Sequence, residues 1–191
     1  MMRWKSVGLM AGMLVLGAAP LQAQAAVIRP DRELTPAESG LRATIYQLRD
    51  SLAMVSGAGA RMERDFRTTS DAALISRARE LARRCEASSR NVPATTAAVK
   101  GAEMQTGLQR DQQVRLLGGL TQLSEALAEC SKRFGAMAAG SKGQEIRDYG
   151  NARLRPVKAE LFRYESAVAG FFKALQIPNP PLGSHPNPII G

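Results

Sequence analysis

Histidine is almost absent from this chain. His185 is the only one among 191 residues, and it lies in a proline-rich stretch near the C-terminus. Acid–base catalysis needs a positioned group with an organised partner, and such a stretch cannot hold a Ser-His-Asp or Cys-His set rigidly. The sequence also lacks a Glu-x-x-His pair, an H-E-x-x-H motif, an EF-hand loop and zinc-ligand spacing. We therefore predict no catalytic residue, no metal, no cofactor and no enzyme activity.

Aromatic residues are also scarce, at 5% of the chain, and β-branched residues are sparse while alanine is abundant. No segment alternates polar and apolar residues with the period of two that marks a half-buried strand. This composition favours helices over strands. The sequence therefore predicts an all-α protein.

Long apolar runs are missing except near the N-terminus. Arg3 and Lys5 precede an uncharged run from residue 7 to 19, and Ala23-Gln24-Ala25 follows it. This order is typical of a secretory signal peptide, and the run is shorter than the roughly 20 residues that span a bilayer. We predict a signal peptide over 1–25, cleavage after Ala25, and a periplasmic or secreted protein.

Cysteine is limited to Cys85 and Cys130, and neither belongs to a C-x-x-C pair. That spacing argues against a thioredoxin-like redox motif and against c-type haem attachment. In an exported chain, a small even number of cysteines favours one disulfide. We expect the bond within one chain, with an intermolecular bond as the alternative.

Apolar residues recur at alternating spacings of four and three along four stretches, which is the pattern of amphipathic helices. The first stretch begins with the capping box Thr35-Pro36-Ala37-Glu38 and carries a long stripe. Its members are Leu41, Ile45, Leu48, Leu52, Val55, Met62 and Phe66. We predict long helices over about 36–67, 70–90, 108–138 and 142–176. These form a four-helix bundle domain spanning 26–176.

The remaining segments are a connection and a tail. Residues 94–107 are poorly patterned and fit either a short helix or a loop. Cys85 and Cys130 both lie near the ends of their predicted helices, and a disulfide needs Cα atoms within about 7 Å. We therefore expect 91–107 to be a crossover that makes the helices over 70–90 and 108–138 run in the same direction. Five prolines predict an extended or disordered tail over 177–191.

Charge is the main surface signal, with a formal net charge of +9, of which Arg3 and Lys5 contribute two. Five arginines crowd the second predicted helix: Arg77, Arg79, Arg83, Arg84 and Arg90. Arginine binds phosphate and carboxylate groups, so these residues are a candidate anion-binding patch, and a solvated face is the alternative. Because no aromatic stacking residue accompanies them, nucleic acid is disfavoured, while transient contact with an anionic membrane surface stays open.

Carboxylates pair along one helix at Glu125 and Glu129, four residues apart. We expect them to form a solvated surface with Lys132 and Arg133, because unbroken apolar stripes indicate no cleft.

Three functional hypotheses follow from these observations. The first is an exported, non-catalytic accessory, adaptor or chaperone-like protein that binds protein partners of the cell envelope. The second is a bundle that holds a small apolar ligand or haem beside Phe162, Tyr164, Phe171 and Phe172. The third is a binder of anionic lipid, polysaccharide or nucleic acid through the arginine-rich face. The sequence leaves the oligomeric state open.

Overall fold

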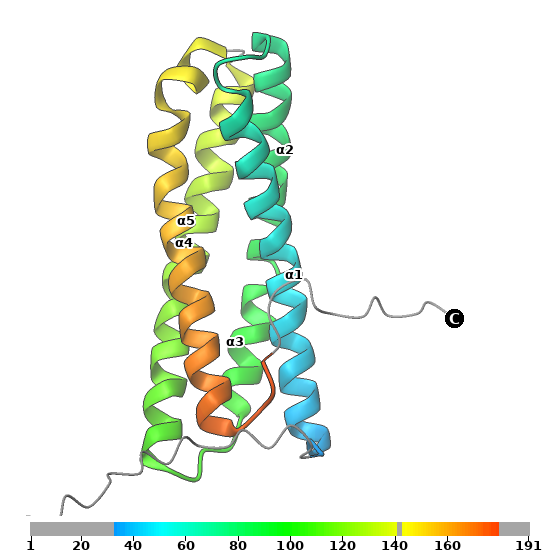
Figure 1. Cartoon of the computed structure of the whole chain (residues 1–191), viewed down its shortest axis with the longest axis vertical. Helices are drawn as coiled ribbons and strands as arrows, with labels where there is room; N and C mark the ends of the chain where they lie inside the picture. The colour runs from blue at the N-terminus through cyan, green and yellow to red at the C-terminus, as the bar shows by residue number, and fades with distance from the viewer. Residues whose placement is uncertain (1–32, 141–142, 180–191) are drawn as a thin grey trace, which may run out of the picture.

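Five α-helices make up the bundle in a computed structural model, which describes residues 33–140 and 143–179. Their bounds are α1 (Pro36–Asp65), α2 (Asp71–Ser89), α3 (Val92–Gly101), α4 (Gly107–Ala139) and α5 (Gly143–Leu175). They lie side by side along one long axis (Figure 1), and the described residues contain no strand. The predicted all-α bundle is confirmed.

Capping boxes begin two of the helices. At α1 the Glu38 amide donates to Thr35 Oγ1 at 3.2 Å, and the Thr35 amide donates to Glu38 Oε2 at 2.9 Å, as predicted. At α4 the same exchange joins Thr106 and Gln109, which the sequence analysis did not single out. The sequence Ser141-x-x-Gln144 also matches a capping box, but Ser141 lies outside the described residues.

The segment predicted as a crossover contains α3, and α3 continues in the direction of α2 (Figure 1). Pro93 has no N–H to extend the ladder of α2 but fits the first turn of a new helix, so the rod breaks there and restarts. The loop then returns the chain into α4. As residue numbers rise along α4, the partners on the α2–α3 rod fall: Val99 faces Gln113, Cys85 faces Cys130 and Ala82 faces Gly135.

The expected parallel arrangement of these two helices is therefore wrong, because α4 runs antiparallel to α2. The error came from treating Cys85 as the end of a full-length helix. Since α3 extends the rod, Cys85 lies partway along it and can meet Cys130 partway along an antiparallel neighbour.

The core is built from the predicted apolar stripes. The stripe predicted over 36–67 is buried throughout, and buried residues repeat at the same spacings on α2 (Leu74, Ala78, Leu81, Cys85) and on α4 (Leu116, Leu120, Leu123, Leu127, Cys130, Phe134, Met137). On α5 the corresponding residues are Ile146, Leu154, Val157, Tyr164, Val168 and Phe171, which are buried, and Leu161 and Leu175, which are half-buried. None of the described helices is sufficiently long and apolar to traverse a bilayer.

The chain after α5 turns back sharply. Gln176 has a φ of 57°, and the Ile177 amide donates to the Phe172 carbonyl at 2.9 Å while the Gln176 amide donates to Lys173. This is a Schellman ending, although glycine is the usual residue at the position with positive φ. The C-terminal segment, residues 177–179, then rises between α1 and α5 (Figure 1), and Ile177 is buried. The first residues of the predicted tail, 177–179, thus pack on the bundle. Its remainder and the predicted signal peptide lie outside the described residues.

Candidate binding surfaces

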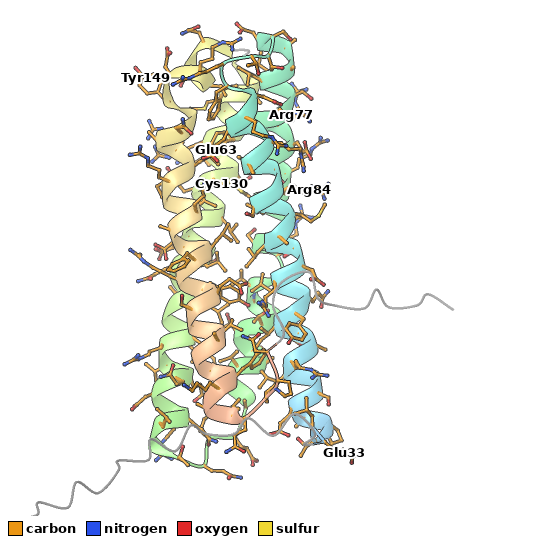
Figure 2. The ribbon with its side chains drawn as sticks, in the orientation of Figure 1. Glu33, Glu63, Arg77, Arg84, Cys130 and Tyr149 are labelled. Atoms are coloured by element: carbon orange, nitrogen blue, oxygen red, sulfur yellow. A yellow bond between two sulfur atoms is a disulfide. The ribbon has the colours of Figure 1, made fainter. Side chains whose placement is uncertain are left out.

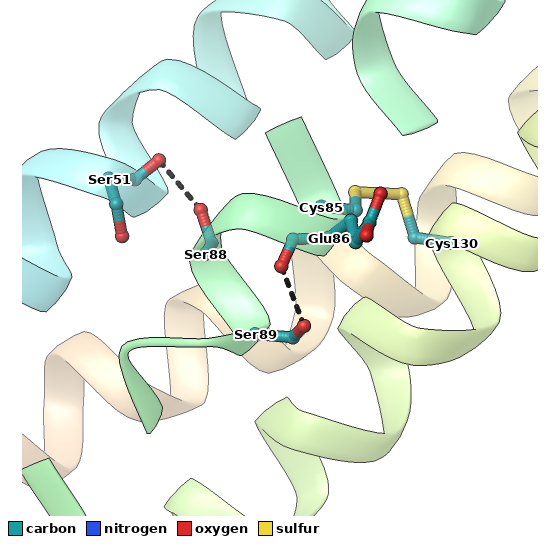
Figure 3. The surroundings of a disulfide bond; sticks show 6 residues. All are labelled: Ser51, Cys85, Glu86, Ser88, Ser89 and Cys130. Atoms are coloured by element: carbon teal, nitrogen blue, oxygen red, sulfur yellow. Dashed lines mark hydrogen bonds between the residues drawn. A yellow bond between two sulfur atoms is a disulfide. The ribbon is translucent and has the colours of Figure 1, made fainter. Parts of the chain in front are cut away.

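A disulfide joins Cys85 of α2 to Cys130 of α4, with Cα atoms 6.1 Å apart (Figure 3). The expected bond within one chain is therefore present. Nearby, the buried Ser88 hydroxyl donates to the Ser51 carbonyl of α1 at 3.0 Å, so the end of α2 is tied to two neighbouring helices. Both cysteines are buried, so the bond lies inside the bundle and links α2 to α4.

The five arginines of α2 and its C-terminal cap do not form one uniform patch. Arg77 is bound to Asp65 at 3.1 Å and Arg90 to Glu86 at 2.6 Å. Arg79 and Arg83 are exposed and Arg84 is half-buried, and these three make no ion pair within the described residues. Figure 2 shows Arg77 and Arg84 on one side of the bundle. Anion binding by the three unpaired arginines stays a prediction.

The aromatic residues proposed to line a ligand cavity separate into two groups. Tyr164, Phe171 and Phe172 are fully buried within the apolar core. Phe162 is 74% exposed, so its expected place beside them is wrong. It sits on the outward side of α5, because a helix turns by about 100° per residue and carries Phe162 away from Tyr164.

A polar cluster lies between α1 and α5, and we call it the α1–α5 seam. Its members are Tyr46 and Arg49 of α1, Glu165 of α5, and Pro178 and Asn179 of the C-terminal segment. Arg49 of α1 is 3% exposed and binds Glu165 of α5 through both carboxylate oxygens, at 2.7 and 3.2 Å. Its third nitrogen donates to Asn179 Oδ1 at 2.8 Å, and its guanidinium lies 5.4 Å from the ring centroid of Tyr46. The Tyr46 hydroxyl donates to the Pro178 carbonyl at 3.3 Å. Buried charge is thus matched by partners from three segments.

Tyr164 lies close to this seam, and its hydroxyl is buried without a hydrogen-bond partner in the described part of the chain. Burial raises the pKa of Tyr164 strongly above its ordinary value, the charge of Glu165 adds to the increase, and Arg49 opposes it. Burial also raises the pKa of Tyr46, opposed by Arg49 and Arg42. Both phenols are therefore held neutral in the folded state.

On its other side, α5 meets α4 along a groove of about 460 Å³, which we call the α4–α5 groove. The contribution of α4 is Gln122, Glu125, Ala126, Glu129, Cys130 and Arg133. The contribution of α5 is Ala152, Arg153, Pro156, Val157, Glu160 and Arg163. A second hollow of about 230 Å³ shares Arg133 and Arg153 and extends towards the α4–α5 turn. The expectation that this bundle offers no cleft is wrong, and Ala126, Ala152 and Pro156 are among the residues that line the groove.

Charges in the groove are arranged with acidic residues at the centre and arginines towards the ends. The antiparallel register sets Gly119 against Ala167 and Gln112 against Gly170. Continued upward, this register places Glu125 of α4 opposite Glu160 of α5. Arg163 lies below Glu160 along α5, and Arg153 lies above it.

Only some of these charges are paired. Glu129 binds Arg133, as expected from their spacing, and Arg163 binds Glu160 Oε1 at 2.5 Å. Glu125 and Arg153 are exposed and make no ion pair within residues 33–140 and 143–179. The groove thus offers one unpaired carboxylate and one unpaired guanidinium.

Two further acceptors line the same groove. Among the described side chains, Glu160 Oε2 is buried and has no hydrogen-bond donor. Pro156 lacks an N–H, so the helical hydrogen bond to the Ala152 carbonyl is not made. A buried acceptor without a donor, such as Glu160 Oε2, raises the free energy of the folded state, whereas the exposed Ala152 leaves its carbonyl open to water.

The sequence contained partial signals for this groove. The sequence showed the carboxylate pair Glu125 and Glu129. It could not show that Ala152 and Pro156 of α5 line the same groove, because that requires the α4–α5 register. Pro156 within a helix was the strongest available sign, because such a residue leaves a carbonyl unpaired.

Comparisons of the chain with protein-family models, curated proteins and solved structures give no match. Any assignment of function therefore depends on the surfaces described above.

Proposed function

We propose that this chain is an exported, non-catalytic accessory or adaptor protein that binds another protein along the α4–α5 groove. Export is supported by the pattern of the first 25 residues and by the disulfide between Cys85 and Cys130. The observation that carries the binding proposal is the groove itself, which presents Glu125 and Arg153, both exposed and unpaired within the described residues.

A protein partner fits this groove better than a small enclosed ligand. Small-molecule pockets bury most of the surface of their ligand. Here six lining residues are exposed, namely Gln122, Glu125, Ala152, Arg153, Pro156 and Arg163. Tyr149 lies on the same face of α5 as Ala152 and Pro156, is 55% exposed, and points outward in Figure 2. Tyrosine and arginine are enriched in protein interfaces relative to the rest of a protein surface.

Site-specific photo-crosslinking tests this proposal. A benzophenone amino acid replaces Ala152 in the groove, and a matched control replaces Ala53, which is exposed on α1. In the cells that make the protein, we expect irradiation to give a discrete protein adduct at position 152 and none at position 53. Equal adducts at both positions, or none at position 152, would refute the groove as the binding surface.

A second candidate function is binding of anionic surfaces by Arg79, Arg83 and Arg84, which make no ion pairs within the described residues. Co-sedimentation with anionic vesicles at low and high salt tests it, because such binding weakens as salt screens the charges. Equal sedimentation of wild type and the triple glutamine variant would eliminate this candidate.

A further inference from the structure

Exposed apolar side chains gather on the two helices that form the α4–α5 groove. Four large apolar side chains of the described parts of α4 and α5 are more than half exposed: Leu108, Val114, Tyr149 and Phe162. Among the other described residues, only Met54 of α1 is a large apolar side chain classed as exposed, at 46%. Apolar side chains that gather on one surface are typical of an interface. The α4–α5 side of the bundle is therefore the side best suited to being covered.

Opposite charges on this side are divided between the two helices. Glu125 belongs to α4 and Arg153 to α5, both line the groove and are exposed, and neither has an ion-pair partner in the described ranges. Since Glu125 lies opposite Glu160 across the groove, Arg153 lies seven residues further along α5, or about 10 Å. A partner that pairs both charges must therefore carry an arginine and a carboxylate with the same offset.

A second copy of the chain carries these two groups with that offset. A twofold axis that crosses the groove midway between Glu125 and Arg153 reverses the long axis of the bundle. It also lays α4 of one copy over α5 of the other. Each Glu125 then lies against the partner's Arg153, because a twofold interface uses the same patch of both copies. One interface thus pairs all four charges.

The area of this side is large enough for a stable dimer. Each of the two helices contains 33 residues and is about 50 Å long, and the axis passes close to Pro156, near the middle of α5. The copies therefore overlap along about 40 Å of a helix pair that is about 20 Å wide. The overlap is about 800 Å² from each copy, which is the size of a standard specific interface.

From these features we propose that the chain forms a twofold homodimer through the α4–α5 groove. Glu125 of each copy pairs with the partner's Arg153, and the exposed rings of Tyr149 and Phe162 are covered at the same interface. This inference rests on the proposed function, because it names the protein partner at that groove as a second copy of the chain.

Charge reversal tests the twofold arrangement. Glu125→Arg alone sets arginine against arginine, and Arg153→Glu alone sets glutamate against glutamate. Each variant should therefore dimerise at least about tenfold more weakly than wild type. An equimolar mixture of the two variants restores both ion pairs, because one copy then carries only arginine and the other only glutamate at these positions. We expect the mixture to dimerise within about threefold of wild type.

Sedimentation velocity from low to high micromolar chain measures the dimer. Physiological salt screens charges that lie more than about 8 Å apart, which reduces the long-range repulsion between two basic chains. The control Asp50→Arg makes the same change of charge at an exposed position of α1 and should leave dimerisation unchanged. A wild type that stays monomeric at every concentration would overturn the inference. So would a mixture of folded variants that dimerises no better than either variant alone.

The photo-crosslinking experiment separates this inference from the proposed function. An adduct at position 152 with twice the mass of the chain supports both. An adduct of any other mass, together with a purified chain that stays monomeric, leaves the proposed function standing and overturns only the homodimer.

Discussion

The two sides of α5 treat charge in opposite ways. On the α1 side, Arg49 is almost fully buried and is matched by Glu165, Asn179 and the ring of Tyr46. On the α4 side, Arg153 is exposed and unpaired within the described residues, and Glu160 keeps one buried oxygen without a donor. Both sides belong to one helix, so helix propensity does not explain the difference.

The difference comes from what covers each side. The C-terminal segment fills the α1–α5 seam, whereas no described segment covers the α4–α5 groove (Figure 1). A buried ion pair contributes little net stability but becomes costly when one partner is removed. Exposed charges contribute little in either case, so they are available for recognition. The comparison therefore separates a surface used for packing from one suited to binding.

Loss of the disulfide should have the largest effect, because Cys130 forms part of the groove wall and its partner Cys85 anchors α2. The bond has a sequence separation of 45 residues, and closing such a loop is worth about 4 kcal/mol in the chain-entropy model. Urea unfolding of the Cys85→Ala, Cys130→Ala double variant should show this loss. A change in the free energy of unfolding below about 1 kcal/mol would show that the disulfide contributes little to the stability of the bundle.

Replacing one arginine on each side tests the comparison directly. Arg49→Met should lower the free energy of unfolding by about 3 kcal/mol, because Glu165 and Asn179 lose a buried partner. Arg153→Met should change it by less than about 0.5 kcal/mol, because its charge is exposed. Thermal and urea unfolding of both variants measure these values. Equal losses of unfolding free energy in the two variants would mean that the arginine on the α1 side of α5 matters no more for stability than the arginine on the α4 side.

Alkaline pH should lower the free energy of unfolding, because the phenol of Tyr164 is buried near the α1–α5 seam. An unfolded tyrosine loses its proton above about pH 10, while burial keeps Tyr164 protonated in the folded state. The favourable contribution is complete below pH 10 and is lost as pH rises, by up to about 1.4 kcal/mol per pH unit. Urea unfolding at pH 9, 10 and 11 should therefore show a steeper fall for wild type than for Tyr164→Phe. Parallel curves would contradict the buried, neutral phenol.

The smallest change in stability is expected for Glu160→Gln. Glutamine keeps the shape of glutamate. The substitution weakens the ion pair with Arg163, but Arg163 is exposed, so this pair contributes little to the free energy of unfolding. The free energy of unfolding should stay within about 0.5 kcal/mol of wild type. A loss above about 2 kcal/mol would mean that Glu160 holds the bundle together.

The sequence predicted the helices well because their apolar stripes and the Thr35 cap are local signals. It failed at the direction of α4, because α3 could not be read as a continuation of α2 from residues 94–107. The α1–α5 seam was also missed, since Arg49 and Asn179 lie 130 residues apart and no local pattern links them. Glu125 was noticed, but its place in the groove depends on the α4–α5 register, and a single helix pattern cannot supply that register.

The central claim is that the α4–α5 groove is a charge-selective surface for a protein partner. Its most direct test is the yield of the adduct at position 152 when Glu125→Gln and Arg153→Gln are introduced together, compared with the yield in the otherwise wild-type chain. The account predicts at least a tenfold fall in yield with unchanged export and folding. An adduct of the same mass at the same yield would contradict it.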